Sequence, residues 1–515
     1  MLNVSAWEDD PKSDPSVRPI IRPVPALKQR RLGVVVVGET PPPARYRPGT
    51  TAFRFWNAAD SLTRGAQYWA GLVPEKTRWY TGDVLPALID AGNDLNAYYD
   101  RRGLCFFHAH VGGEAVYSGE SPDVLCHELG HAVLDALAPA LWNTAAIETA
   151  ALHEAFGDIS AMLSALELES VRTAVIAETA GRLSRSSRIS RLAEQLGWAI
   201  RQSHPDAVDR DCLRNAANSF FYSEPESLPP LAPASALSSQ PHSFSRVFTA
   251  AWLDALAGMA EVVDGAGGSR RAGESSEVAA HMGESHETGR PGASCESGQL
   301  DASRQSGNPA GSGHSSGSRH SRGSADDLLR VSRDAGALLV LAVRLAPIAS
   351  NYFAQVAAEV LRADAALFHG KYREALRRGF VGRGVLSSSS AAMLTEGNGS
   401  RRKPAVPVAA GPQTIWVRVP IEGRIYGLRI GQLLVEAPHT GAGLGVTSAA
   451  PDFGSLPPVS PERASQAFVE DLLRRNRIDP GDLAVAGGPR VRVARTTHRL
   501  ERHGKDVRLV RRLFH

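Results

Sequence analysis

The sequence predicts an α+β fold, in which strands and helices occupy separate stretches of the chain. Three short segments between Asp94 and Tyr117 are typical of strands, because each is apolar or alternating and is bounded by glycine or by charge. Helical periodicity follows from Val124 to about Ala207 and again from Phe244 to Val263. Strands grouped in one region and helices in the next are typical of an α+β fold.

The composition is that of a soluble globular protein with room for several domains. Among 515 residues, 57 are basic and 54 acidic, and this net charge of +3 argues against a nucleic-acid-binding function for the whole chain. Four cysteines are too few for a disulfide scaffold. The longest apolar run, Ala335 to Val343, is far shorter than the roughly 20 residues that cross a bilayer. Because no signal peptide is visible either, we expect a cytoplasmic protein without membrane contact.

Shifts in composition divide the chain into segments. Residues 1–45 are rich in proline and charge, which predicts a loosely ordered arm. Residues 264–326 consist largely of Gly, Ser, Arg, His and Glu and cannot bury enough apolar surface to offset the entropy of ordering, which predicts a disordered insertion. The predicted segments are the arm at 1–45, the strands and first helices of the main domain at 46–263, the insertion at 264–326, the remaining helices at 327–385, a linker at 386–411 and a small separate α+β unit of unknown role at 412–515.

A His-Glu-x-x-His motif at His127 to His131 is the first sign of metal chemistry. On a helix, residues four positions apart lie on one face, so both imidazoles can bind the same ion. Glu128 lies about 100° further round the helix, where its carboxylate can meet a metal-bound water rather than the metal. Taken alone, the motif also fits a surface helix with two solvated histidines.

A catalytic zinc site needs a third protein ligand, and two acids further along the chain are candidates for it. Glu154 follows His131 by 23 positions, a gap that accommodates a turn and an antiparallel second helix. Glu154 and Asp158 are again four positions apart and share a helix face. One of them can bind the metal while the other accepts a hydrogen bond from the distal N–H of a ligand histidine. Two such paired faces on consecutive helices favour a metal site over solvated charge.

The two motifs, CHELGHAV at 126–133 and HEAFGDI at 153–159, resemble the HELTHAV and NEAxSDI motifs of thermolysin-like zinc peptidases, the gluzincins. The resemblance runs from about Asn57 to Val385 without the insertion. It implies a two-lobe fold, with a strand-rich N-terminal lobe and a helical C-terminal lobe, and a zinc-dependent endopeptidase acting on peptides or proteins. It assigns the zinc ligands to His127, His131 and Glu154, the general base to Glu128 and the carboxylate behind a ligand histidine to Asp158.

The resemblance also implies a binding site for the substrate. Asn96 and Ala97 match the Asn-Ala pair of the family's edge strand, which holds the substrate chain. Leu213 and Arg214 match a pair in which the arginine binds a substrate carbonyl and the leucine lines the pocket after the scissile bond. Val124 stands where another apolar residue of that pocket is expected. These matches imply cleavage before a hydrophobic residue.

Several positions depart from the family pattern. His242 matches the histidine that stabilises the oxyanion, but no acid precedes it closely to orient it. Trp142 stands where the family has a tyrosine that helps to bind the oxyanion, and its indole N–H can donate only from a different place. His153 replaces the usual asparagine. Ala165 stands where an acid of the family's calcium pair is expected, so we do not predict structural calcium.

These departures leave a second function open, that of a catalytically inactive zinc-bearing scaffold that binds peptides or a protein partner. The presence of Glu128 favours an active peptidase, because a scaffold has no need for a residue that shuttles protons.

Overall fold

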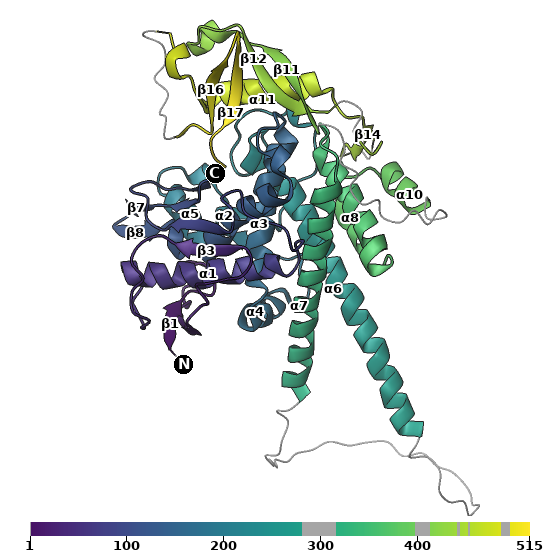
Figure 1. The fold of residues 1–515 in the computed structure, drawn as a ribbon. Coiled ribbons are helices and arrows are strands. Elements are labelled where there is room, and N and C mark those ends of the chain that lie inside the picture. Colours follow the sequence, from purple (N-terminus) through teal and green to yellow (C-terminus); the bar gives the residue numbers. More distant parts are fainter. Residues whose placement is uncertain are drawn as a thin grey trace, which may run out of the picture.

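A four-stranded sheet and a long helix form the N-terminal part of the computed structural model, which describes residues 2–280, 316–396, 413–439, 443–451, 454–485 and 495–514. The sheet has the order β3-β4-β6-β5, with β5 antiparallel to β6 and the other neighbours parallel, so β5 is an edge strand. Helix α1 (Thr51–Ala70) packs beside β3, and Thr50 caps it by accepting a hydrogen bond from the N–H of Phe53 (Figure 1). The strands are β3 (Gly33–Val36), β4 (Val84–Leu88), β5 (Ala97–Tyr99) and β6 (Leu104–Phe106), followed by a hairpin of β7 (His108–Val111) and β8 (Glu114–Tyr117).

The first 45 residues are ordered against this domain, so the prediction of a loosely ordered arm is wrong. Strands β1 (Asn3–Ala6) and β2 (Ile20–Pro23) form an antiparallel hairpin that packs on α1. The backbone N–H of Trp7 donates to the side chain of Asn57 over 2.8 Å, and Asp10 is fully buried. Proline and charge misled the prediction, because several of these charges are paired inside the protein rather than solvated.

Helices α2 (Pro122–Leu137) and α3 (Ile147–Ala165) pack closely against each other behind the sheet. Ser121 caps α2, with Pro122 in the first turn. A Cβ atom on Gly130 would lie 2.9 Å from the Cα of Gly157, so the absence of both side chains allows the two helices to approach.

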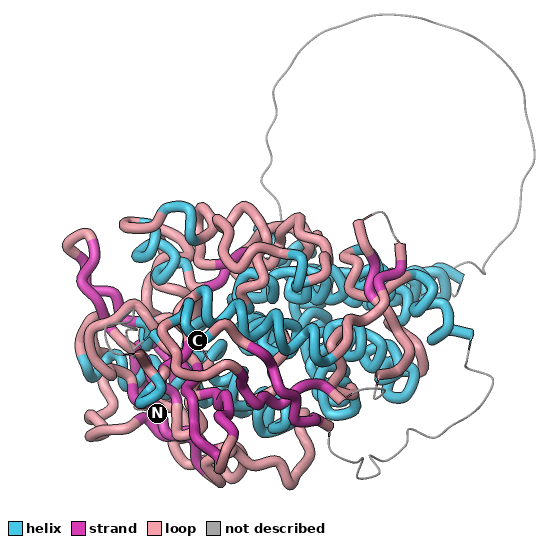
Figure 2. Tube along the Cα trace, turned by 90° about the horizontal axis from the view of Figure 1, so that it is seen from above, coloured by secondary structure: helices cyan, strands magenta, loops and turns pink. Residues whose placement is uncertain are grey.

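The other helices form the second half of the domain. Figure 2 shows the helices gathered towards one side of the molecule and most strands towards the other, which agrees with the predicted α+β class. Two short strands, β9 (Arg191–Leu192) and β10 (Arg214–Asn215), pair between the helices. The helices are α4 (Glu169–Thr179), α5 (Glu194–Arg201), α6 (Pro241–Ala280), α7 (Ser316–Leu345), α8 (Tyr352–Phe368), α9 (Arg373–Gly382) and α10 (Ser388–Glu396).

Helices α6 and α7 extend into the segment predicted as a disordered insertion. Helix α6 continues to Ala280 and α7 begins at Ser316, and residues 281–315 of the predicted insertion lie outside the described part of the chain. Helix α10 likewise falls within the predicted linker at 386–411, of which 397–411 is outside the described residues. Among the helices that are described, none has the length and apolarity needed to cross a bilayer.

The C-terminal region forms the predicted α+β unit, but it is docked rather than separate. Its five-stranded sheet lies at one end of the molecule in Figure 1, in the order β11-β12-β17-β16-β15, with α11 (Pro461–Arg474) packed on it. The backbone N–H of Ala145 donates to the backbone carbonyl of Glu436 in β12, and the hydroxyl of Ser465 in α11 donates to the carbonyl of Ala145. The strands are β11 (Thr414–Pro420), β12 (Gln432–Pro438), β15 (Ile478–Asp479), β16 (His498–His503) and β17 (Asp506–Arg511). A separate two-residue pair of β13 (Ser448–Ala449) and β14 (Ser455–Leu456) lies against the end of α9, where the N–H of Ala449 donates to the carbonyl of Gly384.

Candidate metal centre

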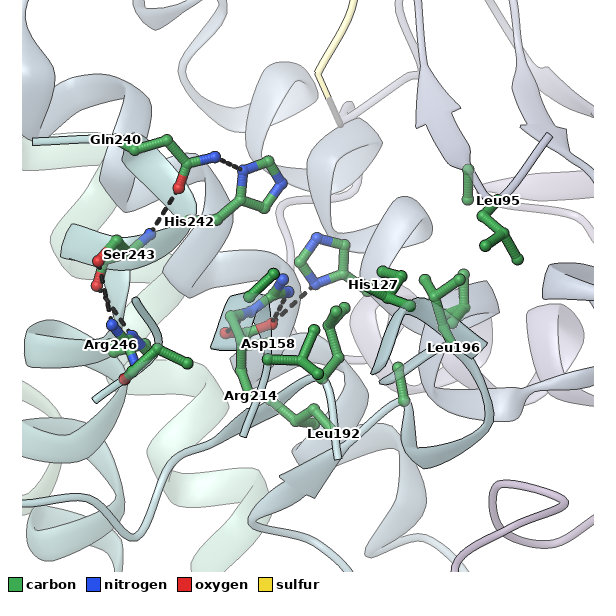
Figure 3. A pocket seen from close by; sticks show the side chains of 18 of the residues that line it. Leu95, His127, Asp158, Leu192, Leu196, Arg214, Gln240, His242, Ser243 and Arg246 are labelled. Carbon is green, nitrogen blue, oxygen red and sulfur yellow. Dashed lines mark hydrogen bonds and ion pairs between the residues drawn. The ribbon is translucent and has the colours of Figure 1, made fainter. Parts of the chain in front are cut away.

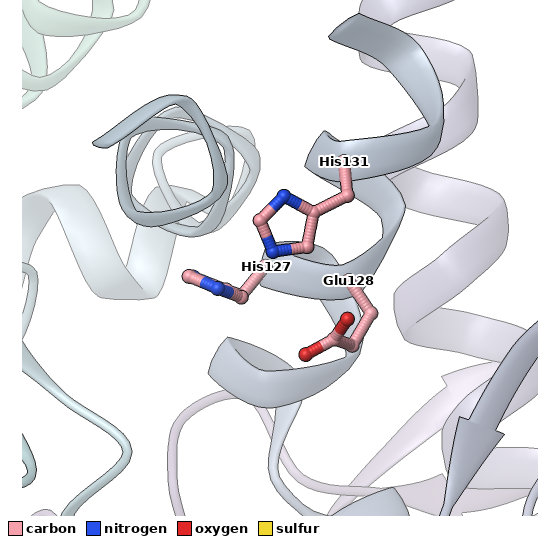
Figure 4. A group of neighbouring side chains, drawn as sticks. All are labelled: His127, Glu128 and His131. Carbon is pink, nitrogen blue, oxygen red and sulfur yellow. The ribbon is translucent and has the colours of Figure 1, made fainter. Parts of the chain in front are cut away.

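The three residues predicted to bind zinc meet between α2 and α3. His127 Nε2 lies 3.5 Å and His131 Nε2 3.9 Å from the same oxygen, Oε2 of Glu154. Figure 4 shows both imidazoles on one side of α2, with Glu128 between them along the chain. Two ligand atoms on a tetrahedral zinc ion lie roughly 3.4 Å apart, given metal–ligand bonds near 2 Å. The spacing of these nitrogen and oxygen atoms therefore fits zinc.

Glycine at position 157 is what allows His127 to lie between the helices. A Cβ atom at this position would lie 2.7 Å from Cε1 and Nδ1 of the His127 ring. The imidazole therefore occupies the space that a side chain on α3 would fill. Sequence reasoning placed Gly157 inside the second motif but gave it no role.

Unsatisfied polar atoms give an independent test of the metal fit. His131 is fully buried, and neither of its ring nitrogens has a hydrogen-bond partner within the described residues. An orphaned buried polar group costs about 1–3 kcal/mol, so a ring without partners is unusual unless something else binds it. A metal ion on Nε2 would remove part of this cost. The donor set of two imidazoles and one carboxylate is the one that catalytic zinc uses.

Asp158 orients His127, as predicted for the carboxylate behind a ligand histidine. Its Oδ1 lies 3.0 Å from His127 Nδ1 and 2.7 Å from Arg214 Nη2 (Figure 3). Burial acts to raise the pKa of Asp158, but Arg214 and His127 outweigh it and hold that pKa below its usual value. The ionised carboxylate of Asp158 accepts a hydrogen bond from the Nδ1–H of His127. Because the ring proton is then on Nδ1, the lone pair of Nε2 is available to a metal.

Glu128 is buried beside the two histidines. Its Oε2 atom accepts no hydrogen bond from the part of the chain that the structure describes. Burial, with the charge of Glu154 in addition, raises the pKa of Glu128 to about 8 although His127 lowers it. The carboxylate borders the same cleft as His127.

A cleft of about 440 Å³ opens next to these residues. The structure brings together there all the residues predicted to bind substrate, which are Asn96, Ala97, Val124, Leu213 and Arg214. Further apolar side chains of the cleft were not predicted from the sequence. They come from β9, α5 and the loop that follows, which lie outside the two motifs. These additional residues are Leu192, Leu196, Ile200 and Val208.

His242 reaches the centre from the start of α6 and has an orienting partner that the sequence did not predict. Its Nε2 lies 3.0 Å from Glu154 Oε2, and its Nδ1 lies 2.9 Å from Nε2 of Gln240. Oε1 of Gln240 accepts from the N–H of Ser243, which fixes the amide so that its NH₂ group donates to His242 (Figure 3). His242 therefore carries its proton on Nε2, the atom that faces the candidate metal centre. An amide two residues away thus replaces the acid that was sought in the sequence.

Trp142 lies elsewhere than predicted. Within the described structure it is not among the residues that line the cleft. Its ring packs edge-on against Tyr99 and Phe514, with centroid distances of 5.7 and 5.2 Å, and only 4% of its surface is exposed. The C-terminal unit supplies Phe514, so this packing could not be foreseen from the motif region alone.

A second group of buried acids adjoins the cleft. One carboxylate oxygen from each of Asp10, Asp123 and Glu194 lies within 4.8 Å of the other two. Neither oxygen of Glu194 has a hydrogen-bond partner in the described chain, although Arg191 lies 3.4 Å away as an ion pair. Burial, together with the charges of Asp10 and Asp123, raises the pKa of Glu194 to about 11. Asp10 comes from the segment predicted to be loose, so the sequence gave no sign of this cluster.

No model of a known protein family matches this chain, and no curated protein sequence matches it.

Proposed function

We propose that the protein is a zinc-dependent endopeptidase with the two-lobe architecture of thermolysin-like peptidases, cleaving before hydrophobic residues. The observation that carries this proposal is the approach of His127, His131 and Glu154 to one another from two helices, with unpaired ring nitrogens on His131. The adjacent cleft supports a peptide substrate, because it combines an apolar wall with a few charged groups.

The residues divide the chemistry among them. His127, His131 and Glu154 would hold a zinc ion, which would supply the Lewis acid for the peptide carbonyl and for the attacking water. Glu128 accepts a proton from the attacking water and delivers it to the leaving nitrogen. Asp158 keeps the His127 ring in the orientation and tautomer that a metal ligand needs.

Two cleft residues meet the substrate's oxygen atoms. The Nε2–H of His242 donates to the negative charge that develops on the carbonyl oxygen, and Gln240 keeps the proton on that nitrogen. Arg214, held by Asp158, binds a carbonyl further along the substrate. Val124 and Leu213, with the apolar side chains around them, take up the hydrophobic side chain that follows the scissile bond.

The test combines zinc content with peptide turnover. We expect the purified wild type to hold zinc and to cleave a quenched peptide library. Cleavage should stop when a chelator removes the metal. Glu128→Ala should keep zinc and lose hydrolysis, because the proton acceptor is gone while the ligands remain. His131→Ala should lose zinc, whereas His110→Ala, at an exposed position in β7, should change neither property. Full activity of Glu128→Ala would remove the role given to this residue.

The alternative is a zinc-bearing scaffold without activity, and the position of Trp142 away from the cleft favours it. A scaffold would retain zinc and bind peptides, but the wild type and Glu128→Ala would be equally inactive in the turnover assay.

We also infer that Asp10, Asp123 and Glu194 bind a hard divalent cation such as calcium. Carboxylate oxygens are the ligands that calcium prefers, and Glu194 is 2% exposed with both oxygens lacking a hydrogen bond in the described structure. Because burial raises the pKa of Glu194 to about 11, this carboxyl would release its proton when a cation binds, and the cation would then balance the charge of the three carboxylates.

A further inference from the structure

Strand β5 offers a peptide-binding edge beside the candidate metal centre. It is the last strand of its sheet, and on the inner side Ala97 and Tyr99 are paired with Phe106 and Leu104 of β6. Backbone groups alternate between the two edges of a strand, so Ala97 and Tyr99 present their N–H and C=O groups to the same, outer edge. Ala97 also lines the cleft with His127. The N–H of Ala97 already donates to Oδ1 of Asn96 over 2.9 Å, so an extended peptide in the cleft would meet the carbonyl of Ala97 first and the backbone of Tyr99 two residues later.

Phe514 occupies this edge at Tyr99. The N–H of Tyr99 donates to the carbonyl of Phe514 over 3.1 Å, and the N–H of Phe514 donates back over 2.9 Å, in an antiparallel bridge. The ring of Phe514 stacks on His153, with centroids 3.9 Å apart, and lies 5.3 Å from the ring of His131. Both the backbone and the ring of Phe514 therefore fill the end of the edge, next to a predicted zinc ligand.

The occupied end lies on the amino-terminal side of the expected scissile bond. The pocket that contains Val124 and Leu213 is the one assigned to the residue after that bond. Phe514 lies beyond Glu154 and His242, with which it lines a separate cavity of only about 30 Å³. A space of this size holds about one water molecule and no amino-acid residue. Residues that precede the scissile bond would extend towards this closed end.

Phe514 is held in place by the docked C-terminal unit and is not a loose tail. Arg511 donates from Nε to the carbonyl of Trp142 over 2.7 Å, and its guanidinium lies 3.8 Å from the centroid of the Phe514 ring. At a second point, Ser239 donates to Asp471 of α11 over 2.9 Å. With the contact of β12 to Ala145, three elements of the unit fix its position.

We propose that Phe514 determines substrate specificity by ending the peptide-binding edge on the amino-terminal side of the scissile bond. This inference rests on the proposed function, because the direction of the peptide comes from it. Peptides with one residue before the scissile bond fit the cleft, whereas longer amino-terminal extensions compete with Phe514 for the backbone of Tyr99. The preferred substrates are therefore peptides cleaved close to their amino end, so this inference replaces the endopeptidase activity proposed above with the release of single residues or very short peptides from the amino end.

The test measures binding separately from hydrolysis. Two fluorescent peptides share the same sequence from the scissile bond onwards and carry either one or four residues before it. Their affinities are measured by anisotropy with the zinc-loaded full chain carrying Glu128→Gln, which removes the proton acceptor. We expect the short peptide to bind about tenfold more tightly than the long one, since the loss of two backbone hydrogen bonds and a clash oppose the latter.

Variants at the closed end sharpen the result. Phe514→Ala removes the ring that fills the space, and Phe514→Pro removes the N–H that donates to Tyr99. Each variant should bind the long peptide with about tenfold higher affinity than the Glu128→Gln protein does, and its affinity for the short peptide should be unchanged. Leu509→Ala, at a buried position of β17 in the same unit, is the matched control and should leave the ratio of affinities as it is.

The outcomes separate this inference from the proposed function. Equal affinities of the two peptides for the Glu128→Gln protein, or no binding of either, would overturn the role of Phe514 even if the Phe514 variants failed to fold. A preference for the short peptide without hydrolysis by the protein that retains Glu128 would support the closed edge and count against the peptidase.

Discussion

At the residue scale, the side chains around Glu154 carry more hydrogen-bonding capacity than the described protein atoms satisfy. His131 has two unpaired ring nitrogens and Glu128 an unpaired oxygen, whereas Asp158 is fully engaged by His127 and Arg214. These unpaired atoms fit a site that is completed by an ion and a substrate, and the buried His153 nearby likewise has no partner for either ring nitrogen within the described residues. The zinc and turnover assays on Glu128→Ala and His131→Ala are the direct tests at this scale.

A buried carboxyl outside the centre predicts how stability changes with pH. Glu148 accepts hydrogen bonds from the hydroxyl of Tyr222 and the N–H of Phe353, and burial raises its pKa from 4.5 to about 8. The folded state therefore holds this proton more tightly than the unfolded state. Its contribution to stability is complete below pH 4.5 and is lost as the pH rises through about 8.

Glu148→Gln should remove this dependence. We expect the melting temperature of the variant, relative to wild type, to increase as the pH is raised across that window in a series of thermal melts. Glu462→Gln, at an exposed position of α11, serves as the control and should follow the wild type. A constant difference between Glu148→Gln and wild type at every pH would contradict the raised pKa.

At the element scale, the close contact of α2 and α3 is what sets the metal centre. Gly157→Ala would place a methyl group 2.7 Å from the His127 ring and force the ligand to move. We expect zinc affinity, measured by competition with a chromophoric chelator, to fall about 10- to 100-fold, the range seen when the surroundings of a ligand are disturbed.

The control for this variant is Gly382→Ala. Gly382 is also a helical residue, the last one of α9, and has open space where a Cβ atom would lie. It should bind zinc like the wild type. Wild-type zinc affinity in a folded Gly157→Ala protein would show that His127 does not depend on this contact.

The same two helices show how far the sequence alone could go. The positions of His127, His131, Glu154 and Asp158 follow from helical spacing, which is a local property, and the structure brings these four residues together. A strand at Ala97 was also predicted from its local pattern, and its place at the edge of the sheet was implied by the resemblance to thermolysin-like peptidases. By contrast, the partner of His242 was sought among acids, and no local signal marks an amide as the orienting group.

At the scale of the whole molecule, segments from both ends of the described chain reach the cleft region, which no local pattern indicates. Asp10 joins Asp123 and Glu194 from the N-terminal segment, and Phe514 pairs with Tyr99 from the C-terminal unit. These contacts join residues separated by more than a hundred positions, and such pairing depends on the complete fold rather than on spacing. The predicted loose arm and separate unit failed for this reason.

The acid cluster predicts that calcium stabilises the protein. Calcium should raise the melting temperature of the wild type, because a ligand that binds only the folded state shifts the equilibrium towards it. Asp10→Asn should show a smaller rise, since one charged ligand is lost. Asp14→Asn, at an exposed neighbouring position, should respond like the wild type. An identical calcium response of the Asp10 variant would exclude this residue as a ligand.

The central claim is that His127, His131 and Glu154 hold one zinc ion. X-ray absorption at the zinc edge, on protein loaded and then dialysed, tests it together with the metal stoichiometry. The account predicts one zinc per chain, with only nitrogen and oxygen neighbours at about 2.0–2.2 Å and an imidazole signal that is lost in His131→Ala. A chain that retains no zinc, or zinc with sulfur among its neighbours, would contradict it.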